Sequence, residues 1–282
     1  MTTLFEGIIG HEKVIELMEN ELLNPGQAYL LVGPESVGKG TVASRFAAGL
    51  LGGATDDRAR RLALSGTHPD LTILEPEGAT SLGVDQAREV VTRASMAPIE
   101  SSRTVFLFPD AGSMTDSASN ALLKTLEEPT ASVVFLLVAG SEDDFPPTVA
   151  SRCRTIHMGR VPHEEITASL IERGMGSEAA AGVAIVSGGR PGLALSLMTH
   201  PEVARFRELW LSIPGQVTPH PGDGQRLASM ILGELAPLVE DSVSSDLSKE
   251  KAQRARRRIE MSLLVNGLEI LASWYVDAAS LQ

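Results

Sequence analysis

The chain has 282 residues, of which 43% are hydrophobic, and it carries a formal net charge of −12 at pH 7. This length and composition suit one large domain, or about two to three small ones, with a sizeable core. The acidic charge argues against a protein that grips DNA phosphates by itself, because such binding depends on Lys and Arg. We find no signal pattern and no apolar run long enough to span a bilayer, and we therefore expect a cytoplasmic protein.

The first half of the chain alternates between helical and strand-like patterns. An apolar stripe predicts a helix before residue 24, and the polar stretch 52–67 predicts a solvated helix or loop. Strands are expected at 28–32, 71–74, 104–108, 133–139 and 155–158, and further helices at 84–94 and 117–128. This alternation predicts an α/β fold built on a parallel sheet with right-handed crossovers.

A glycine-rich stretch between the first strand and the next helix predicts a phosphate-binding P-loop, which begins at Gly33. Gly33 and Gly38 let backbone N–H groups curl around phosphate oxygens, and Lys39 adds a full positive charge. Gly40 stands where the motif needs a Ser or Thr ligand for Mg²⁺. Thr41 comes one residue late, which turns its side chain by about 100° on a helix. The alternative is a glycine turn without a ligand, and we favour the P-loop.

The strand pattern ends after Gly159, and helical segments separated by glycine and proline follow. Short helices are expected at 163–173, 177–187 and 191–198. A further helix is expected from residue 203, with breaks at Pro214-Gly215 and at 219–222. We therefore predict an α/β nucleotide-type domain at 1–160, a helical lid at 161–202 and a helical domain at 203–282.

The last helix is expected from Lys249 to Val276. Its apolar residues at three-four spacing predict a seam that packs on other helices: Met261, Leu264, Leu268, Leu271 and Tyr275. A basic run opens this helix, and it could touch DNA or a subunit or form a solvated face: Lys249, Lys251, Arg254, Arg256, Arg257 and Arg258.

Two further segments carry a family resemblance, namely 120–129 (Asn-Ala-Leu-Leu-Lys-Thr-Leu-Glu-Glu-Pro) and Ser151-Arg152-Cys153. Together with the P-loop they resemble the clamp-loader branch of AAA+ proteins. Finer features look like the delta-prime family of bacterial DNA polymerase III clamp-loader subunits: 27–30, 33–35, 68–71, 84–89, 189–195 and Trp274-Tyr275. The resemblance implies an AAA+ α/β module, a small helical lid and an all-α collar-type oligomerisation domain, which is shorter here than is usual for the family.

Members of this family that hydrolyse ATP carry an Asp-Glu pair after the third strand, for Mg²⁺ and for the attacking water. Counting back from Asn120, these places fall on Pro109 and Asp110. Proline offers no side-chain oxygen, and phosphoryl transfer needs both metal and positioned water. The resemblance therefore implies negligible hydrolysis, weak or absent ATP and Mg²⁺ binding, and no required cofactor. The alternative for Asp110, which we favour, is an N-cap of the following turn.

Arg152 is the site residue that the resemblance marks most clearly. In the family this arginine projects across a subunit boundary into a neighbour's ATP site, and guanidinium forks onto phosphate oxygens. The alternative is a local pair with a carboxylate. Arg190 in the lid is a second candidate phosphate contact, and its alternative is a surface arginine that caps a carbonyl. The family's usual lid arginine falls on Gly192, and Ser141 is the only polar candidate for a γ-phosphate sensor.

No metal site is expected. The family often has four cysteines for zinc between the P-loop helix and His68, whereas this stretch has none, so zinc is not expected. His68 is predicted to be structural. Cys153 is the only cysteine, which excludes an internal disulfide, and it is predicted to be a small buried apolar residue rather than a nucleophile.

The resemblance implies a stator subunit of the DNA polymerase III clamp loader that does not hydrolyse ATP. Its implied partners are gamma/tau-type ATPase and delta-type subunits in a hetero-oligomeric ring, and through them the sliding clamp and primed DNA. Arg152 would serve the adjacent ATPase, whose hydrolysis loads the clamp during DNA replication. Two alternatives stay open: an active gamma-type ATPase and a non-replicative AAA+ adaptor that binds only protein.

Overall fold

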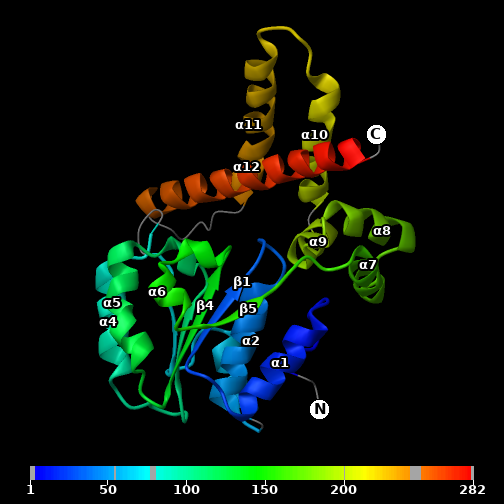
Figure 1. Cartoon of the computed structure of the whole chain (residues 1–282). Coiled ribbons are helices and arrows are strands. Elements are labelled where there is room, and N and C mark those ends of the chain that lie inside the picture. The colour runs from blue at the N-terminus through cyan, green and yellow to red at the C-terminus, as the bar shows by residue number, and fades with distance from the viewer. Residues whose placement is uncertain (1–3, 54, 77–80, 200, 242–248, 281–282) are drawn as a thin grey trace. The chain divides into compact units, whose positions relative to one another are not determined.

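The computed structural model describes residues 4–53, 55–76, 81–199, 201–241 and 249–280 (Figure 1). The chain divides into two compact units, Met1–Ala194 and Leu195–Gln282. Some side chains in the helices after residue 185 also lie outside this description.

The first unit is built on a parallel sheet. Its described strands follow the order β2-β3-β4-β1-β5. They are β1 (Ala28–Val32), β2 (Leu71–Ile73), β3 (Thr104–Phe108), β4 (Val133–Ala139) and β5 (Arg154–His157). Every residue of β1, β3 and β4 is buried, as is typical of parallel strands covered on both faces. The expected parallel α/β fold is therefore confirmed.

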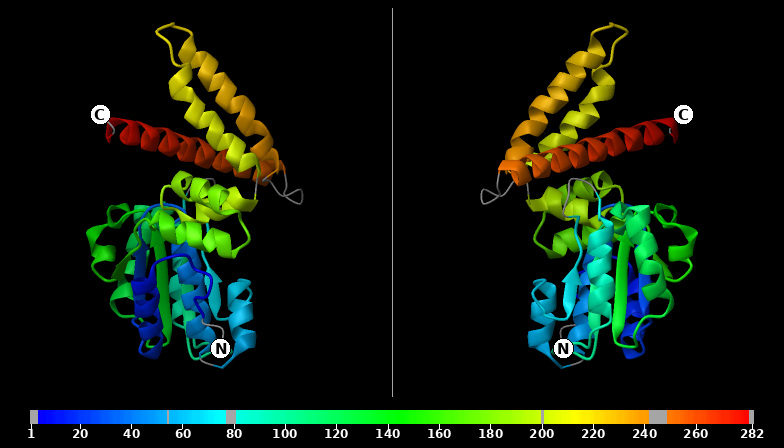
Figure 2. Two further views of the ribbon diagram at one scale, coloured as in Figure 1. Left: turned by 90° about the vertical axis from the view of Figure 1, so that its right-hand side faces the viewer. Right: turned by 90° about the vertical axis from the view of Figure 1, so that its left-hand side faces the viewer.

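Helices cover both faces of this sheet (Figure 2). On one face lie α1 (Glu12–Leu23), α2 (Lys39–Gly52) and α3 (Asp57–Leu64). On the other lie α4 (Val84–Ala94), α5 (Asp116–Glu127) and the short α6 (Pro147–Ala150). The polar stretch 52–67, for which helix and loop were both open, thus contains a helix.

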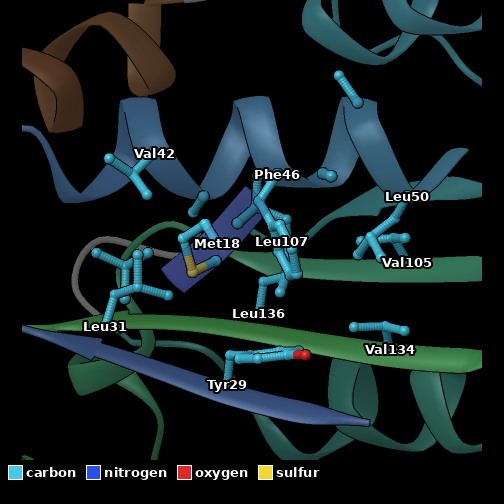
Figure 3. Close-up of a cluster of buried hydrophobic side chains, with 14 of the residues drawn as sticks. Met18, Tyr29, Leu31, Val42, Phe46, Leu50, Val105, Leu107, Val134 and Leu136 are labelled. Carbon is cyan, nitrogen blue, oxygen red and sulfur yellow. The ribbon is translucent and has the colours of Figure 1, made fainter. Parts of the chain in front are cut away.

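Alternation along the strands sends neighbouring side chains into two separate cores. Tyr29 and Leu31 of β1 face α2, whereas Leu30 points to the opposite core. Figure 3 shows α2 lying over the sheet with Phe46 pointing toward the strands. Phe46 meets Tyr29 edge to face, with ring centroids 5.0 Å apart. These two cores hold the end of β1, and with it the P-loop, in place.

The rest of the chain is helical, as expected. The first unit continues with α7 (His163–Glu172), α8 (Ser177–Val186) and the start of α9 (Pro191–Thr199). The second unit contains α10 (Pro201–Gln216), α11 (Asp223–Asp241) and α12 (Lys249–Ser280). None of the described helices has the length and apolar content that a membrane crossing requires.

The break expected at Pro214-Gly215 is wrong, because α10 continues through both residues to Gln216. Pro214 lies in the last turn, where a proline removes a single helical hydrogen bond and leaves the rest of the helix intact. The break expected at 219–222 is confirmed, since α11 begins at Asp223.

The predicted seam of α12 is partly wrong. Leu264 and Leu271 do pack against the core of the second unit. Met261, Leu268 and Tyr275 are instead exposed, by 62%, 57% and 52%. The core is formed by another set of side chains: Phe206, Trp210, Ile213, Leu227, Leu235 and Ile270.

A tight contact explains which face of α12 turns inward. A Cβ atom built on Gly267 would lie only 1.9 Å from the Trp210 ring. Only glycine therefore admits this indole, and the helix is rotated so that Gly267 faces α10. The buried face then passes through Ile270 rather than through Leu268.

Candidate functional site

The P-loop connects β1 to α2 with a backbone that depends on glycine at its first position. Gly33 has φ +149°, and a Cβ atom there would lie 2.0 Å from the Met158 carbonyl oxygen. Gly38 has φ +110° and precedes the first helical residue, Lys39. The Gly33 N–H donates to the Gly140 oxygen at 3.2 Å, which ties the loop to the end of β4. The strand, loop and helix context that the motif requires is therefore present.

Lys39 is buried and directs its ammonium group at the loop itself. Nζ donates to the carbonyl oxygens of Gly33 and Pro34, at 2.5 and 2.6 Å. Burial lowers the pKa of Lys39, against the opposing effect of the nearby Glu35 and Asp144 carboxylates. The lysine that would hold phosphate in a working P-loop is thus engaged with backbone oxygens.

Two other segments bind the carbonyl groups of the same loop. The Gly192 N–H donates to the Ser36 oxygen at 2.8 Å, and His11 Nε2 donates to the Val37 oxygen at 2.9 Å. A Cβ atom on Gly192 would lie 2.9 Å from the Ser36 oxygen, closer than real Cβ atoms approach a backbone atom. The position where the resemblance expects a lid arginine therefore has no room for a side chain in this conformation.

The positions that would support Mg²⁺ carry no suitable oxygen at Gly40 and Pro109. Thr41 and Asp110 are exposed. Asp110 is the N-cap residue of the short turn at Ala111–Ser113, as the favoured alternative expected. Its carboxylate makes no capping bond, and its backbone oxygen instead accepts from the Ser113 hydroxyl at 2.7 Å. The short turn at Ala111–Ser113 closes through backbone atoms, which leaves the Asp110 side chain free of that task.

The loop after β4 contains an acidic group that sequence reasoning missed. Ser141 caps a short turn, and its hydroxyl accepts from the Asp143 N–H at 3.2 Å. Asp144 closes the same turn by accepting from the Ser141 N–H at 2.9 Å, and its charge acts on Lys39. Three consecutive acidic residues stand here, and the sequence does not reveal which of them faces the P-loop. Among the described residues, no cluster of three or more His, Cys, Asp or Glu could hold a metal.

Arg190 lies in the turn that precedes α9. Its Nε donates to the Ser187 oxygen at 3.1 Å, so the carbonyl-capping alternative is the one that the structure shows. The expectation of a surface position is wrong, because Arg190 is buried. The sequence alone did not indicate that burial.

Arg152 lies between α6 and β5 and folds back onto its own chain. Its Nη2 pairs with the Glu127 carboxylate at the end of α5, and its Nη1 donates to the Thr148 oxygen. The local carboxylate pair, which was the alternative to a finger, is thus what this single chain shows. The neighbouring Cys153 is half-buried, and burial raises the pKa of its thiol to about 11, which disfavours a nucleophilic role.

The His-Pro-Asp segment is structural, as predicted for His68, whose Nδ1 accepts from the Asp70 N–H at 3.1 Å. Sequence reasoning missed the task of Asp70. Its buried carboxylate accepts from the backbone N–H groups of Ile99, Glu100 and Ser101, at 2.6, 2.8 and 2.7 Å. Burial opposes ionisation of Asp70, but these three donors outweigh it and lower the pKa. Asp70 therefore fixes the loop between α4 and β3.

The basic run opens α12, as expected, and Arg256 and Arg257 are exposed. The other basic side chains of this run lie outside the described residues: Lys249, Lys251, Arg254 and Arg258.

Comparison with known proteins agrees with the motifs. A family model described as DNA polymerase III, delta subunit, matches residues 10–162, which is more than half of the chain. The chain is 40% identical over 134 residues to the DNA polymerase III subunit delta′ of Pseudomonas aeruginosa, covering 45% of this chain and 41% of that protein. It is 38% identical over 143 residues to subunit delta′ of Escherichia coli, covering 50% of this chain and 42% of that protein. These matches span less than half the length of both relatives.

Among solved structures, a DNA polymerase III gamma subunit-related protein from Thermotoga maritima aligns over 91% of this chain and 97% of its own. Its sequence identity to this chain is 16%, and the TM-score is 0.43. The family model instead spans the sheet, the P-loop and the Ser-Arg-Cys segment. This match and the two delta′ relatives agree with the predicted delta-prime resemblance. The chain therefore belongs to the DNA polymerase III delta subunit family.

Proposed function

We propose that this chain is a delta-prime-type clamp-loader subunit that does not hydrolyse ATP and that supplies Arg152 to the ATP site of a neighbouring subunit. The observation that carries the first half of this proposal is the state of the P-loop. Lys39 is bound to the loop's own carbonyl oxygens, and neither Gly40 nor Pro109 offers an oxygen to a metal. Phosphoryl transfer needs a metal and a positioned water, and this site lacks the side-chain oxygens that would hold the metal.

The negative charges near the P-loop also disfavour the binding of a nucleotide. Glu35 and Asp144 both lie close enough to Lys39 to influence its titration. A bound triphosphate would add several negative charges beside these two carboxylates, and like charges repel. This arrangement supports the proposal of weak or absent nucleotide binding.

The second half of the proposal concerns Arg152. Its side chain is partly exposed, and the Ser-Arg-Cys segment that carries it matches the family model. A guanidinium group is always charged and presents a fork that fits phosphate oxygens. We propose gamma/tau-type ATPase and delta-type subunits as ring partners, and the sliding clamp and primed DNA as contacts of the whole complex. The curated relatives include a tau subunit of Bacillus subtilis, at 29% identity over 171 residues.

Reconstitution with the clamp-loader subunits of the same organism tests the role of Arg152. We expect Arg152→Ala to lower DNA-stimulated ATP turnover, by on the order of a hundredfold or more at the site that Arg152 serves. Arg154→Ala is the matched control, because Arg154, like Arg152, pairs with a glutamate of its own chain. Turnover unchanged by Arg152→Ala would contradict the finger role.

Titration of the isolated chain with ATP and Mg²⁺ tests the state of the P-loop. We expect no binding at micromolar concentrations, and no change in the titration on Lys39→Ala. Robust Mg²⁺-dependent turnover that disappears in Lys39→Ala would instead favour the active gamma-type ATPase. Failure to copurify with the catalytic loader subunits would favour a non-replicative adaptor.

A further inference from the structure

The pair formed by Arg152 and Glu127 joins two elements that are distant in the sequence. Glu127 is the last residue of α5, and Arg152 follows α6. The Glu127 carboxylate accepts from Nη2, and the Thr148 oxygen accepts from Nη1. Both Nη groups of the proposed finger are thus occupied within the chain, so neither is directed at a neighbour.

These contacts leave part of the Arg152 guanidinium without a hydrogen bond. Arg152 Nε is buried and has no hydrogen-bond partner among the described residues, and a buried donor left unpaired is unfavourable. The side chains of Arg152 and Glu127 are 30% and 46% exposed, so solvent weakens their attraction. A competing anion with better geometry can therefore draw the guanidinium away.

The position of Glu127 supplies an independent reason to look for a role. A carboxylate in the last turn of a helix faces the negative end of the helix dipole, which is unfavourable. Glu127 and Glu128 both stand at this end of α5, yet only Glu127 pairs with Arg152 among the described residues. The ion pair with Arg152 offsets the repulsion between the Glu127 carboxylate and the end of α5. When Arg152 leaves, that repulsion returns.

We propose that Glu127 is a positioning residue that holds Arg152 back and competes with the phosphates of the neighbouring ATP site for its guanidinium. This inference rests on the proposed role of Arg152 as a finger. Carboxylate and phosphate oxygens bind the same face of a guanidinium fork, so Nη2 serves one of them at a time. The neighbour's ATP site receives Arg152 only when its phosphates come close enough to displace Glu127.

The pair itself is tested in the isolated full chain by NMR of the arginine side-chain nitrogens, with the Arg152 signals assigned by their loss in Arg152→Lys. We expect restricted rotation and a shifted Nη signal for Arg152, and loss of both features in Glu127→Gln. Glu128→Gln, the matched control, leaves them unchanged. Arg152 signals that are the same in Glu127→Gln and wild type would overturn the proposal, whatever Arg152 does in a complex.

The restraint, by which Glu127 holds Arg152 back from the neighbouring ATP site, is tested by ATP turnover in the reconstituted complex. We expect Glu127→Gln to raise turnover without DNA by about two- to fivefold, the range that an exposed ion pair supports. The rise should occur in kcat and not in KM, because Glu127 touches no nucleotide in this proposal. Glu128→Gln leaves turnover unchanged, and combining Glu127→Gln with Arg152→Ala removes the gain.

The outcomes separate the two proposals. Unchanged or lower turnover in Glu127→Gln overturns the restraint even when Arg152→Ala abolishes activity. Unchanged turnover in Arg152→Ala overturns the finger role and the restraint together, while the NMR result still decides whether the pair exists in solution.

Discussion

The backbone N–H of Gly192 donates to the carbonyl oxygen of Ser36 at 2.8 Å, so the lid helix α9 begins directly on the P-loop. A Cβ atom on Gly192 would lie 2.9 Å from that oxygen and could fit only if the backbone moved. We expect Gly192→Ala to lower the free energy of unfolding by about 1 to 2 kcal/mol, as other overpacked contacts do.

Urea unfolding measures this change, and Gly182→Ala supplies its control. Gly182 lies inside α8, and a Cβ atom there would meet nothing within 4 Å. Because alanine favours a helix over glycine, Gly182→Ala should stabilise the chain by about 0.5 to 1 kcal/mol. A stabilising effect of Gly192→Ala would show that the lid does not rest on the P-loop in solution.

The Asp70 carboxylate predicts a second large effect on stability. In Asp70→Asn the amide retains a single acceptor oxygen for three backbone N–H donors, and its NH₂ group faces donors. We expect the free energy of unfolding to fall by about 2 to 3 kcal/mol, the range for hydrogen bonds to a charged group. Asp85→Asn, at an exposed position in α4, should change it by less than about 0.5 kcal/mol. Equal effects of the two variants would contradict the anchoring role.

The same carboxylate predicts a dependence on pH. The pKa of Asp70 is lower in the folded chain than its ordinary value, so the folded state favours the ionised form. The stabilisation is present above the unfolded-state pKa, about 3.9, and is lost as the pH falls through the lowered folded-state pKa. The difference in unfolding free energy between wild type and Asp70→Asn should stay constant above about pH 5 and shrink below about pH 4. A difference that shrinks near neutral pH would point to another group.

In the second unit, Gly267→Ala should displace the Trp210 ring. The added methyl group would lie 1.9 Å from the indole, and we expect a loss of about 2 to 3 kcal/mol. Trp210 is buried and Trp274 is partly exposed, so displacement should shift the tryptophan emission toward longer wavelength. Gly233→Ala is the control, because a Cβ atom on Gly233 would meet nothing within 4 Å. Unchanged emission in Gly267→Ala would contradict this packing.

The sequence predicted best those elements whose hydrophobic pattern can be interpreted without knowing which other element packs against them. The continuous apolar runs of β1, β3 and β4 were placed residue for residue, because buried parallel strands need no polar face. The buried face of α12 was predicted less well. Three-four spacing placed Leu268 on that face, whereas the contact between Gly267 and the Trp210 ring sets the rotation of the helix about its axis and leaves Leu268 exposed.

Within the site, the P-loop was visible because its spacing and its context are local. The contact between Glu127 and Arg152 was foreseen only as an unnamed carboxylate, because it links positions 25 residues apart. The burial of Arg190 and the influence of Asp144 on Lys39 also depend on how distant segments fold together. Sequence spacing carries no record of such contacts.

The two hydrogen bonds that reach Ser36 and Val37 come from Gly192 and His11, which stand near opposite ends of the first unit. The loop therefore cross-links the beginning of the chain to the lid. Reshaping this loop around a ligand would rupture both links at once, and the amide proton of Gly192 would then exchange rapidly with deuterium.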